Sequence, residues 1–271
     1  MRKWLEYSLS KKKKNFKNQF SYSNHLLKRD DKNLKKLNNF NEFKKNKLFF
    51  TQYKYFKNKI KNNTIFLCSG YGLYEYFLKK NFKNFIISDV SAKYKKYNSY
   101  NKFLDFKKVN VLKPLDFKKF KFKPSVIVLN NVEYLFNDYQ MLNCMGNISL
   151  LANKKTKIYI IFRSRYYSFL SFYDKILLPA ELILKKIIFF IMGKKRVLNL
   201  NLHGYRRTKY EFEYLLKKKF KVLNLYEDLY TLDYERSLLI RKLKLEKFLK
   251  FIFLNSHPYL NIYKLKKKTS N

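Results

Sequence analysis

The stretch TIFLCSGYGLYEYFLKKNFKNFIISDVS, residues Thr64 to Ser91, contains the pattern that decides the fold. Thr64–Leu67 is a short apolar run, which predicts a buried strand. Ser69 to Gly72 follows as a turn with two glycines, which would let a ligand approach the backbone closely. Leu73–Lys80 then has the spacing of a helix. These residues predict a strand, a binding turn and a helix in succession.

A second apolar run, Phe85–Ile87, leads to Asp89. Asp89 stands roughly 20 residues after Gly70, the separation at which nucleotide-binding α/β folds place an acid for ribose hydroxyls. Glu75 occupies the position of the third glycine of the G-x-G-x-x-G pattern, so a dinucleotide pyrophosphate is not expected as the ligand. The stretch therefore predicts half of a nucleotide-type binding site.

The same stretch resembles the first two motifs of the class I S-adenosylmethionine-dependent methyltransferases. In that family the turn usually reads acid-x-Gly-x-Gly-x-Gly, whereas Phe66 stands here at the position of the acid and Cys68 at that of the first glycine. The resemblance implies that the turn receives the methionine end of S-adenosylmethionine and that Asp89 binds its ribose. Because of the two departures, a catalytically dead relative is an alternative, as is an ordinary strand-turn-helix unit of another α/β protein.

A second segment matches the same family further along the chain. Ser125–Leu129 is a continuous β-branched run, which predicts a strand buried on both faces. The sequence NNVEYLFND at residues 130–138 follows it, and it is similar to the segment after the fourth strand of small-molecule methyltransferases of the ubiquinone-biosynthesis type. Glu133 stands at the glutamate of that segment, and Tyr134 replaces its histidine. The alternative is a polar turn that caps the helix predicted over Tyr139–Leu151.

A third segment, HGYRRTKYEFEYLLKKKFKV at residues 203–222, resembles the block before the last strands of the same families. Thr208 and Glu211 have the spacing of a capping box, which predicts the start of a helix over Lys209–Lys219. In the family the histidine region borders the acceptor site. The resemblance therefore implies that His203 contacts the acceptor, or acts as a base when the acceptor is a hydroxyl, with a purely structural role as the alternative.

The resemblance implies a site at the carboxyl ends of the strands, where ligands bind in open α/β sheets. Arg163, after the strand predicted over Lys157–Phe162, is a candidate contact for an acidic group of the substrate, or else a solvated charge. No metal site is expected, because the two cysteines do not form a C-x-x-C pair. The residues expected to bind S-adenosylmethionine are Cys68, Ser69, Gly70, Gly72, Asp89, Val90, Asn110, Val111 and Asn130. Those expected to take part in catalysis are His203, Glu133 and Tyr134.

The expected fold is α/β, with a Rossmann-like, mostly parallel central sheet, an antiparallel terminal hairpin, helices on both faces and an N-terminal helical cap. Further strands are predicted at Val109–Leu112, Val222–Leu225 and Ser237–Ile240, the last two forming the hairpin. Ala92–Phe106 has a helical pattern.

The chain is predicted to divide into three parts. Residues 1–60 form a basic helical extension, with a solvated, partly disordered tail as the alternative. Residues 61–243 form the methyltransferase-like domain, and residues 244–271 a basic tail with a surface helix. Residues 166–202 are interpreted as an insertion of amphipathic helices that cover the substrate or lie in a membrane interface, with packing in the core as the alternative.

The formal net charge is +42, from 61 Lys and Arg against 19 Asp and Glu. Such an excess indicates nucleic acid or an anionic membrane surface as a partner, although heavy use of Lys, Asn, Phe, Tyr and Ile throughout is typical of an AT-rich genome. The N-terminus has no apolar signal region, and no uncharged apolar run is long enough to span a bilayer. We expect a cytoplasmic protein, with peripheral contact to a membrane as a variant.

The expected function is S-adenosylmethionine-dependent methylation of a small-molecule acceptor, hydrophobic or membrane-proximal in view of residues 166–202. One alternative is an RNA methyltransferase, which the basic N-terminal region and its aromatic residues favour. Asn130 does not begin an asparagine-proline-proline-aromatic signature, which weakens the version that modifies a base. The other alternative is a non-catalytic binding protein on the same fold, motivated by Phe66 and Cys68.

Overall fold

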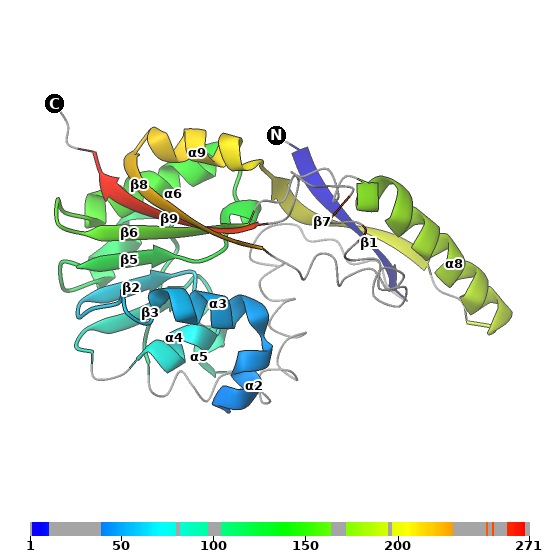
Figure 1. Ribbon diagram of the computed structural model, residues 1–271, viewed down its shortest axis with the longest axis horizontal. Helices are drawn as coiled ribbons and strands as arrows, with labels where there is room; N and C mark the ends of the chain where they lie inside the picture. The colour runs from blue at the N-terminus through cyan, green and yellow to red at the C-terminus, as the bar shows by residue number, and fades with distance from the viewer. Residues whose placement is uncertain are drawn as a thin grey trace.

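The computed structural model describes residues 2–10, 39–79, 82–96, 104–163, 172–194, 197–229, 248, 251 and 259–268. The strands in these residues form one sheet of seven strands and one of two. Figure 1 shows the larger sheet with helices on both faces, and the smaller sheet projecting from one end of it together with helix α8. We call this projection the arm; it is formed by β1 (Arg2–Ser10), β7 (Val197–Arg206) and α8 (Leu178–Ile191).

The seven-stranded sheet has the strand order β4-β3-β2-β5-β6-β9-β8. The first five strands in this order run parallel to one another, and β9 runs antiparallel to both β6 and β8. The expected Rossmann-like, mostly parallel sheet with an antiparallel hairpin is confirmed. Its strands are β2 (Thr64–Leu67), β3 (Phe85–Asp89), β4 (Asp105–Lys108), β5 (Val126–Leu129), β6 (Lys157–Arg163), β8 (Phe220–Leu229) and β9 (Tyr259–Lys267).

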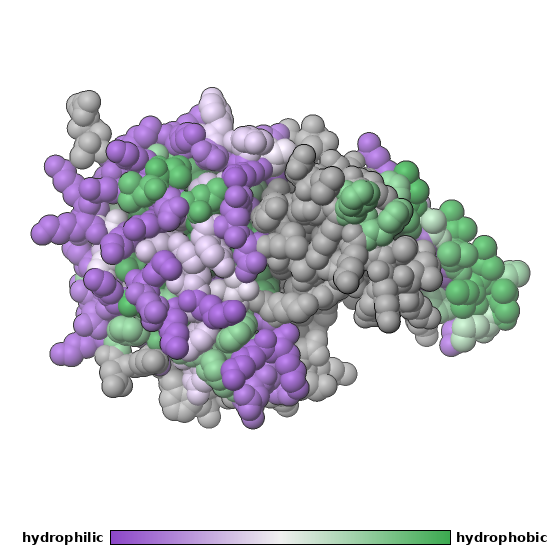
Figure 2. All heavy atoms as spheres, in the orientation of Figure 1, coloured by the Kyte–Doolittle hydropathy of each residue, from purple (hydrophilic) through white to green (hydrophobic). Residues whose placement is uncertain are grey.

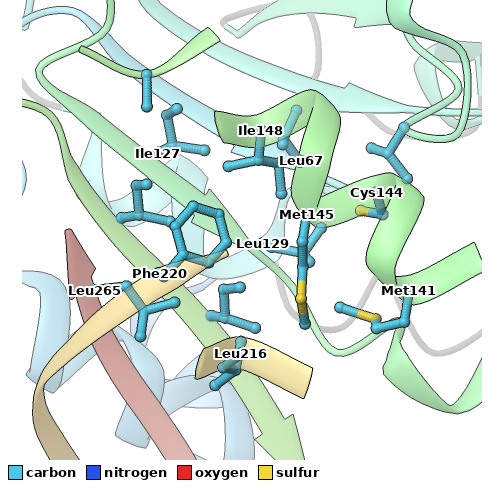
Figure 3. Close-up of a cluster of buried hydrophobic side chains, with 14 of the residues drawn as sticks. Leu67, Ile127, Leu129, Met141, Cys144, Met145, Ile148, Leu216, Phe220 and Leu265 are labelled. Carbon is cyan, nitrogen blue, oxygen red and sulfur yellow. The ribbon is translucent and has the colours of Figure 1, made fainter. Parts of the chain in front are cut away.

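The central strands β2 and β5 are buried along their whole length because helices cover both faces of the sheet. Successive side chains of a strand point to opposite faces. Leu67, Ile127 and Leu129 therefore belong to one core cluster, which lies under α6 (Asp138–Leu151) and α9 (Lys209–Lys217). Figure 3 shows the side chains of α6 and α9 pointing into this cluster.

The opposite face of the sheet is covered by the helices that precede and follow β2. Phe66 and Val128 belong to its core cluster, together with Phe43 and Phe56 of the N-terminal helices. The helical cap expected in the N-terminal extension is thus confirmed for α2 and α3. The helices of this face are α2 (Phe40–Lys45), α3 (Lys47–Phe56) and α4 (Leu73–Leu78).

The first residues of the chain form a strand, which differs both from the basic helical extension predicted for residues 1–60 and from its alternative, a partly disordered tail. Arg2–Ser10 is β1, which pairs antiparallel with β7, Val197–Arg206. The register places Leu5 opposite Leu202 and Leu9 opposite Leu198. Apolar residues at every second position indicate strands, but this period alone does not identify the distant partner strand. Residues 11–38 of the predicted N-terminal extension lie outside the described residues.

One strand of the main sheet lies before its predicted position. β4 is Asp105–Lys108 rather than Val109–Leu112, and the helical pattern over Ala92–Phe106 corresponds to a short helix, α5, at Lys93–Lys96. Val109 and Val111 are buried in the core cluster although they lie in the loop after β4. Both valines are apolar because the loop buries their side chains in the core, and not because they belong to a strand.

The hairpin partner also lies elsewhere than predicted. Ser237–Ile240 is outside the described residues, and the strand between β6 and β8 is β9, from the segment predicted to be a basic tail. The domain limit at residue 243 is therefore wrong. Leu260, Ile262 and Leu265 of β9 are buried, but the lysines between and after them hid the strand in the sequence. Of the predicted surface helix, only Phe248 and Phe251 are described, and both are helical and exposed.

The insertion predicted over residues 166–202 is only partly helical. A π-helical turn, Tyr173–Leu177, leads into α8, Leu178–Ile191, and β7 then begins at Val197. Glu181 and Leu182 of α8 are buried, whereas most of its other apolar side chains are exposed. No helix among the described residues is both long enough and apolar enough to cross a membrane.

Because β9 completes the sheet, truncating its central side chain should destabilise the whole domain. Ile262 is fully buried, and we expect Ile262→Ala to lower the free energy of unfolding by about 2–5 kcal/mol in urea titrations. Lys266→Ala, at an exposed position of the same strand, is the control and should change it by less than about 0.5 kcal/mol. Equal effects of the two substitutions would mean that this segment is not part of the core.

Candidate functional site

The turn after β2 has a backbone that depends on its glycines. Cys68, Gly70 and Gly72 all have positive φ angles, of 58°, 56° and 69°. Side chains disfavour this left-handed region, so glycine is the residue that adopts it at least cost. Gly72 is also the residue at which α4 begins, and its N–H donates a hydrogen bond to the carbonyl of Ser69 at 3.0 Å. The chain thus reverses tightly above the end of β2.

Asp89 ties this turn to the neighbouring strand. It ends β3 and is 8% exposed. One carboxylate oxygen, Oδ2, accepts a hydrogen bond from Gly70 N–H at 3.0 Å, and Oδ1 accepts one from Ser91 N–H at 3.3 Å. Burial raises the pKa of Asp89 to about 6, against which these backbone donors act. A carboxylate offers about four lone-pair sites, so Asp89 can still accept bonds from a ligand.

The turn and Asp89 open onto a cavity of about 480 Å³. The structure brings together nine of the predicted site residues on its wall. Gly72 lies behind the wall, at the start of α4, and Arg163 is not on the wall either. The predicted residues on the wall are Cys68, Ser69, Gly70, Asp89, Val90, Asn110, Val111, Asn130 and Tyr134.

A polar network lies on the wall where α4 meets the end of β5. Asn130 Nδ2 donates hydrogen bonds to Glu75 Oε1 at 2.8 Å and to Ser69 Oγ at 3.3 Å. The Tyr74 hydroxyl donates to Asn130 Oδ1. The side-chain amide of Asn130 is therefore held in one orientation, with its nitrogen toward Glu75 and Ser69.

Glu75 is a wall residue that the sequence did not assign to the site. It is 1% exposed, and burial raises its pKa to about 8. Its position was interpreted only as a missing glycine. The signal that could have identified it is an acid in the first turn of a helix that is otherwise apolar, directly after the binding turn.

The charge of the cavity is opposite to that of the protein. The chain has 61 Lys and Arg, but the described residues on the wall include no Lys, Arg or His. Glu75 and Asp89 are the two carboxylic acids there. The walls are otherwise rich in aromatic side chains, such as Phe49, Tyr71 and Tyr94. Such a cavity suits a neutral or positively charged ligand with an aromatic portion.

The loop after β5 forms another part of the cavity wall. It contains the short helix η4, Glu133–Leu135, which contacts β7. Tyr134 is on the wall, whereas Glu133 is buried elsewhere, with Oε1 accepting a hydrogen bond from Arg163 N–H at 3.3 Å. His203 lies in β7, but its side chain is outside the described residues.

Arg207 fixes this loop from the far side. It is 2% exposed, and its guanidinium donates to the carbonyls of Glu133 and Phe136 and to Asp138 Oδ1. Asn137 begins α6 with a capping box, and the predicted capping box of Thr208 begins α9. The loop is therefore held by Arg207 and by the capping box at Asn137, where α6 begins.

No group of three or more His, Cys, Asp and Glu side chains that could hold a metal ion occurs in the part of the chain that the structure describes.

Several solved structures with a similar course of the chain are described as methyltransferases. N-methyltransferase NodS from Bradyrhizobium japonicum, in complex with S-adenosylhomocysteine, is 11% identical over 90% of this chain and 98% of its own, with a TM-score of 0.49. A SAM-dependent methyltransferase from Archaeoglobus fulgidus is 12% identical over 80% and 90%, with a TM-score of 0.48. Magnesium protoporphyrin IX methyltransferase from Synechocystis, with bound SAM, is 8% identical over 82% and 80%, with a TM-score of 0.46.

No family profile matches the sequence, and no curated protein sequence matches it significantly. The resemblance to class I methyltransferases therefore rests on the sequence motifs and on the strand order of this chain. Identities of 8–12% carry no information about the acceptor.

Gly204 provides a direct test of how β7 meets the loop. Its φ angle is +146°, and a Cβ there would lie 2.2 Å from the carbonyl oxygen of Tyr134. We expect Gly204→Ala to lower the free energy of unfolding by at least about 2 kcal/mol, because backbone must move. Gly146→Ala is the matched control, since its Cβ would meet nothing within 4 Å.

Gly146 lies within α6, so its replacement should stabilise the protein by about 0.4–1 kcal/mol. Thermal and urea unfolding of both variants would check the opposite signs. A neutral Gly204→Ala would mean that β7 does not pack against the loop.

Proposed function

We propose that the protein is an S-adenosylmethionine-dependent methyltransferase that acts on a small-molecule acceptor. The observation that carries the proposal is the hydrogen bond from Gly70 N–H to Asp89 Oδ2, 3.0 Å long, which sets a glycine turn and a carboxylate side by side at one cavity. The cavity of about 480 Å³ is within the roughly 300–1,000 Å³ of small-molecule sites. Its aromatic and acidic walls suit an adenosine that carries a positive sulfonium.

Each wall residue has a proposed place along the cofactor. The remaining lone pairs of Asp89 accept hydrogen bonds from the ribose hydroxyls, and Asn110 and Val111 border the adenine ring. Gly72 shapes the turn without touching the ligand. The other residues proposed to contact the cofactor are Cys68, Ser69, Gly70, Val90 and Asn130.

When bound, S-adenosylmethionine supplies a methyl group that an acceptor atom displaces in line from the sulfonium. The protein has to orient the acceptor and exclude water. We assign Tyr134 to the sulfonium end and His203 to the acceptor, where it takes the proton if the acceptor is a hydroxyl. His203 precedes Gly204, whose backbone packs on Tyr134, and this supports its place near the cavity. Glu133, off the wall, is proposed as a positioning residue for the loop.

Calorimetric titration with S-adenosylmethionine and S-adenosylhomocysteine tests the cofactor. Asp89→Asn puts an amide nitrogen where one acceptor oxygen was, and we expect it to weaken both ligands about tenfold or more. Asp105→Asn, an exposed position on β4, is the control and should leave both affinities unchanged. The affinity of the wild-type protein should also fall as the pH is lowered through about 6, where Asp89 becomes protonated.

Absence of heat and of thermal stabilisation with either ligand would remove the cofactor from the account. Binding without transfer of a labelled methyl group to extracted lipids and small molecules would favour the non-catalytic alternative. Transfer of the labelled methyl group to RNA, added as a separate acceptor, would instead favour the RNA methyltransferase suggested by the basic N-terminal region.

We further propose that the acceptor is hydrophobic and is met at a membrane. The support is the exposed face of α8, where Ile183, Ile187, Phe190 and Ile191 are 50–86% exposed. Figure 2 shows hydrophobic residues gathered on the projecting arm, while hydrophilic residues cover most of the visible surface of the sheet domain. Residues spaced by three and four positions form a stripe along a helix, and an apolar stripe of this kind lies in the interface of a bilayer.

Charge favours a bilayer with anionic lipids as the occupant of this face. Lys175, Lys186 and Lys194 are exposed at the two ends and in the middle of α8 and its flanking turns. Lys185 pairs with the buried Glu181 at 3.8 Å, which neutralises the one acid of the helix. With a formal net charge of +42 behind it, the arm would be attracted to a negative surface.

Co-sedimentation with phosphatidylcholine vesicles, with and without phosphatidylserine, tests this docking. We expect binding that requires phosphatidylserine, and loss of at least about tenfold in affinity for the double variant Ile187→Ser and Phe190→Ser. Tyr139→Ser with Leu150→Ser removes two comparably exposed apolar side chains from α6 and should bind like the wild type. Wild-type protein that ignores both vesicles would contradict the proposal, and self-association abolished by the α8 variant would indicate a second copy instead.

A further inference from the structure

Glu75 is the least expected side chain on the cavity wall. It is 1% exposed, and no ion pair among the described residues includes it. Burying a carboxyl group without a cation is unfavourable, because the charged form loses its hydration. The chain has many lysines that could pair with this acid, yet no basic residue is among the described residues that line its cavity.

The two oxygens of Glu75 differ in their surroundings. Oε1 accepts the hydrogen bond from Asn130 Nδ2 at 2.8 Å, whereas Oε2 is buried and has no hydrogen-bond partner among the described residues. Ser69 Oγ lies 3.3 Å from the same Asn130 nitrogen, so a second oxygen acceptor is at hand. Glu75 Oε2 therefore remains a buried acceptor without a hydrogen bond from the described residues, close to the Ser69 hydroxyl.

We propose that Glu75, with Ser69, forms a subsite for a primary ammonium group of the ligand, oriented by Asn130. An ammonium is a compact charge with three donors, which suits one carboxylate oxygen and a nearby hydroxyl. A guanidinium fits less well, because its fork engages both oxygens of a carboxylate and Oε1 is already occupied by Asn130. The inference rests on the proposed function, under which the group is the amino group of S-adenosylmethionine.

The subsite makes binding release a proton. Burial raises the pKa of Glu75 to about 8, so the group is mostly protonated at neutral pH in the free protein. An ammonium beside it favours the carboxylate, so the proton leaves as the ligand binds. On the same wall only Asp89 has a pKa near this range, of about 6, and α3 contributes Phe49 and Gln52, which do not titrate. The other titratable side chains on the wall are Cys68, Tyr71, Tyr74, Tyr94 and Tyr134.

A pair of ligands separates this subsite from the rest of the site. S-adenosylhomocysteine carries the ammonium group, and 5′-methylthioadenosine has the same adenosine and a thioether sulfur without the amino-acid part. We expect Glu75→Gln to weaken S-adenosylhomocysteine about tenfold or more and 5′-methylthioadenosine less than about twofold. Glu181→Gln, at another buried glutamate but on the arm, is the matched control and should change neither affinity.

Calorimetry in two buffers of different ionisation enthalpy gives a second readout that needs no variant. At pH 7 the wild-type protein should release close to one proton with S-adenosylhomocysteine and markedly less with 5′-methylthioadenosine. Thermal unfolding checks that Glu75→Gln is folded.

Two failures are distinguishable. If 5′-methylthioadenosine binds but S-adenosylhomocysteine gains nothing from Glu75 and releases no proton, the subsite is wrong and the proposed function stands. If neither nucleoside binds the wild-type protein, the proposed function fails and the ammonium subsite fails with it.

Discussion

The hydrogen bond between Gly70 N–H and Asp89 Oδ2 is the contact on which the rest of the site depends. It joins the ends of two adjacent parallel strands, β2 and β3, and so holds the turn in the one shape that leaves a cavity beside it. The positive φ angles at Gly70 and Gly72 make that shape accessible. The buried carboxylate is therefore part of the architecture of the turn before any ligand arrives.

The loop after β5, which forms another part of the cavity wall, is also held in place by contacts to its backbone. Arg207 donates to two carbonyls of the loop after β5, and Gly204 lets β7 approach Tyr134 closely. Both walls are thus positioned by contacts to the backbone. β7 continues into the arm, where it pairs with β1.

The elements around the site could be predicted because their signals are local. The buried strands β2 and β5 are unbroken apolar runs, and the capping residues Asn137 and Thr208 lie beside the helices that they begin. β9 could not be recognised in the same way because its lysines masked the alternation, and β1 and β7 could not because the meaning of their alternation depends on a distant partner strand.

The candidate site was likewise predicted where it follows from the turn and the strand ends, and missed where it depends on tertiary contact. Motif comparison pointed to Gly70, Asp89 and Asn130, which line one cavity, but it treated Glu75 as a lost glycine. What gives Glu75 its character is Asn130, 55 residues further along the chain. The net charge of the protein also did not indicate the charge of the cavity. Among the described residues, the wall of the cavity has two acids and no basic side chain.

The central claim is that the space between the glycine turn and Asp89 holds an adenosine. A crystal structure of the protein soaked with S-adenosylhomocysteine tests this most directly. The account predicts density for the ligand in that cavity, with both ribose hydroxyls at the Asp89 carboxylate. Clear density for the ligand elsewhere on the protein, or a ribose that does not reach Asp89, would contradict it.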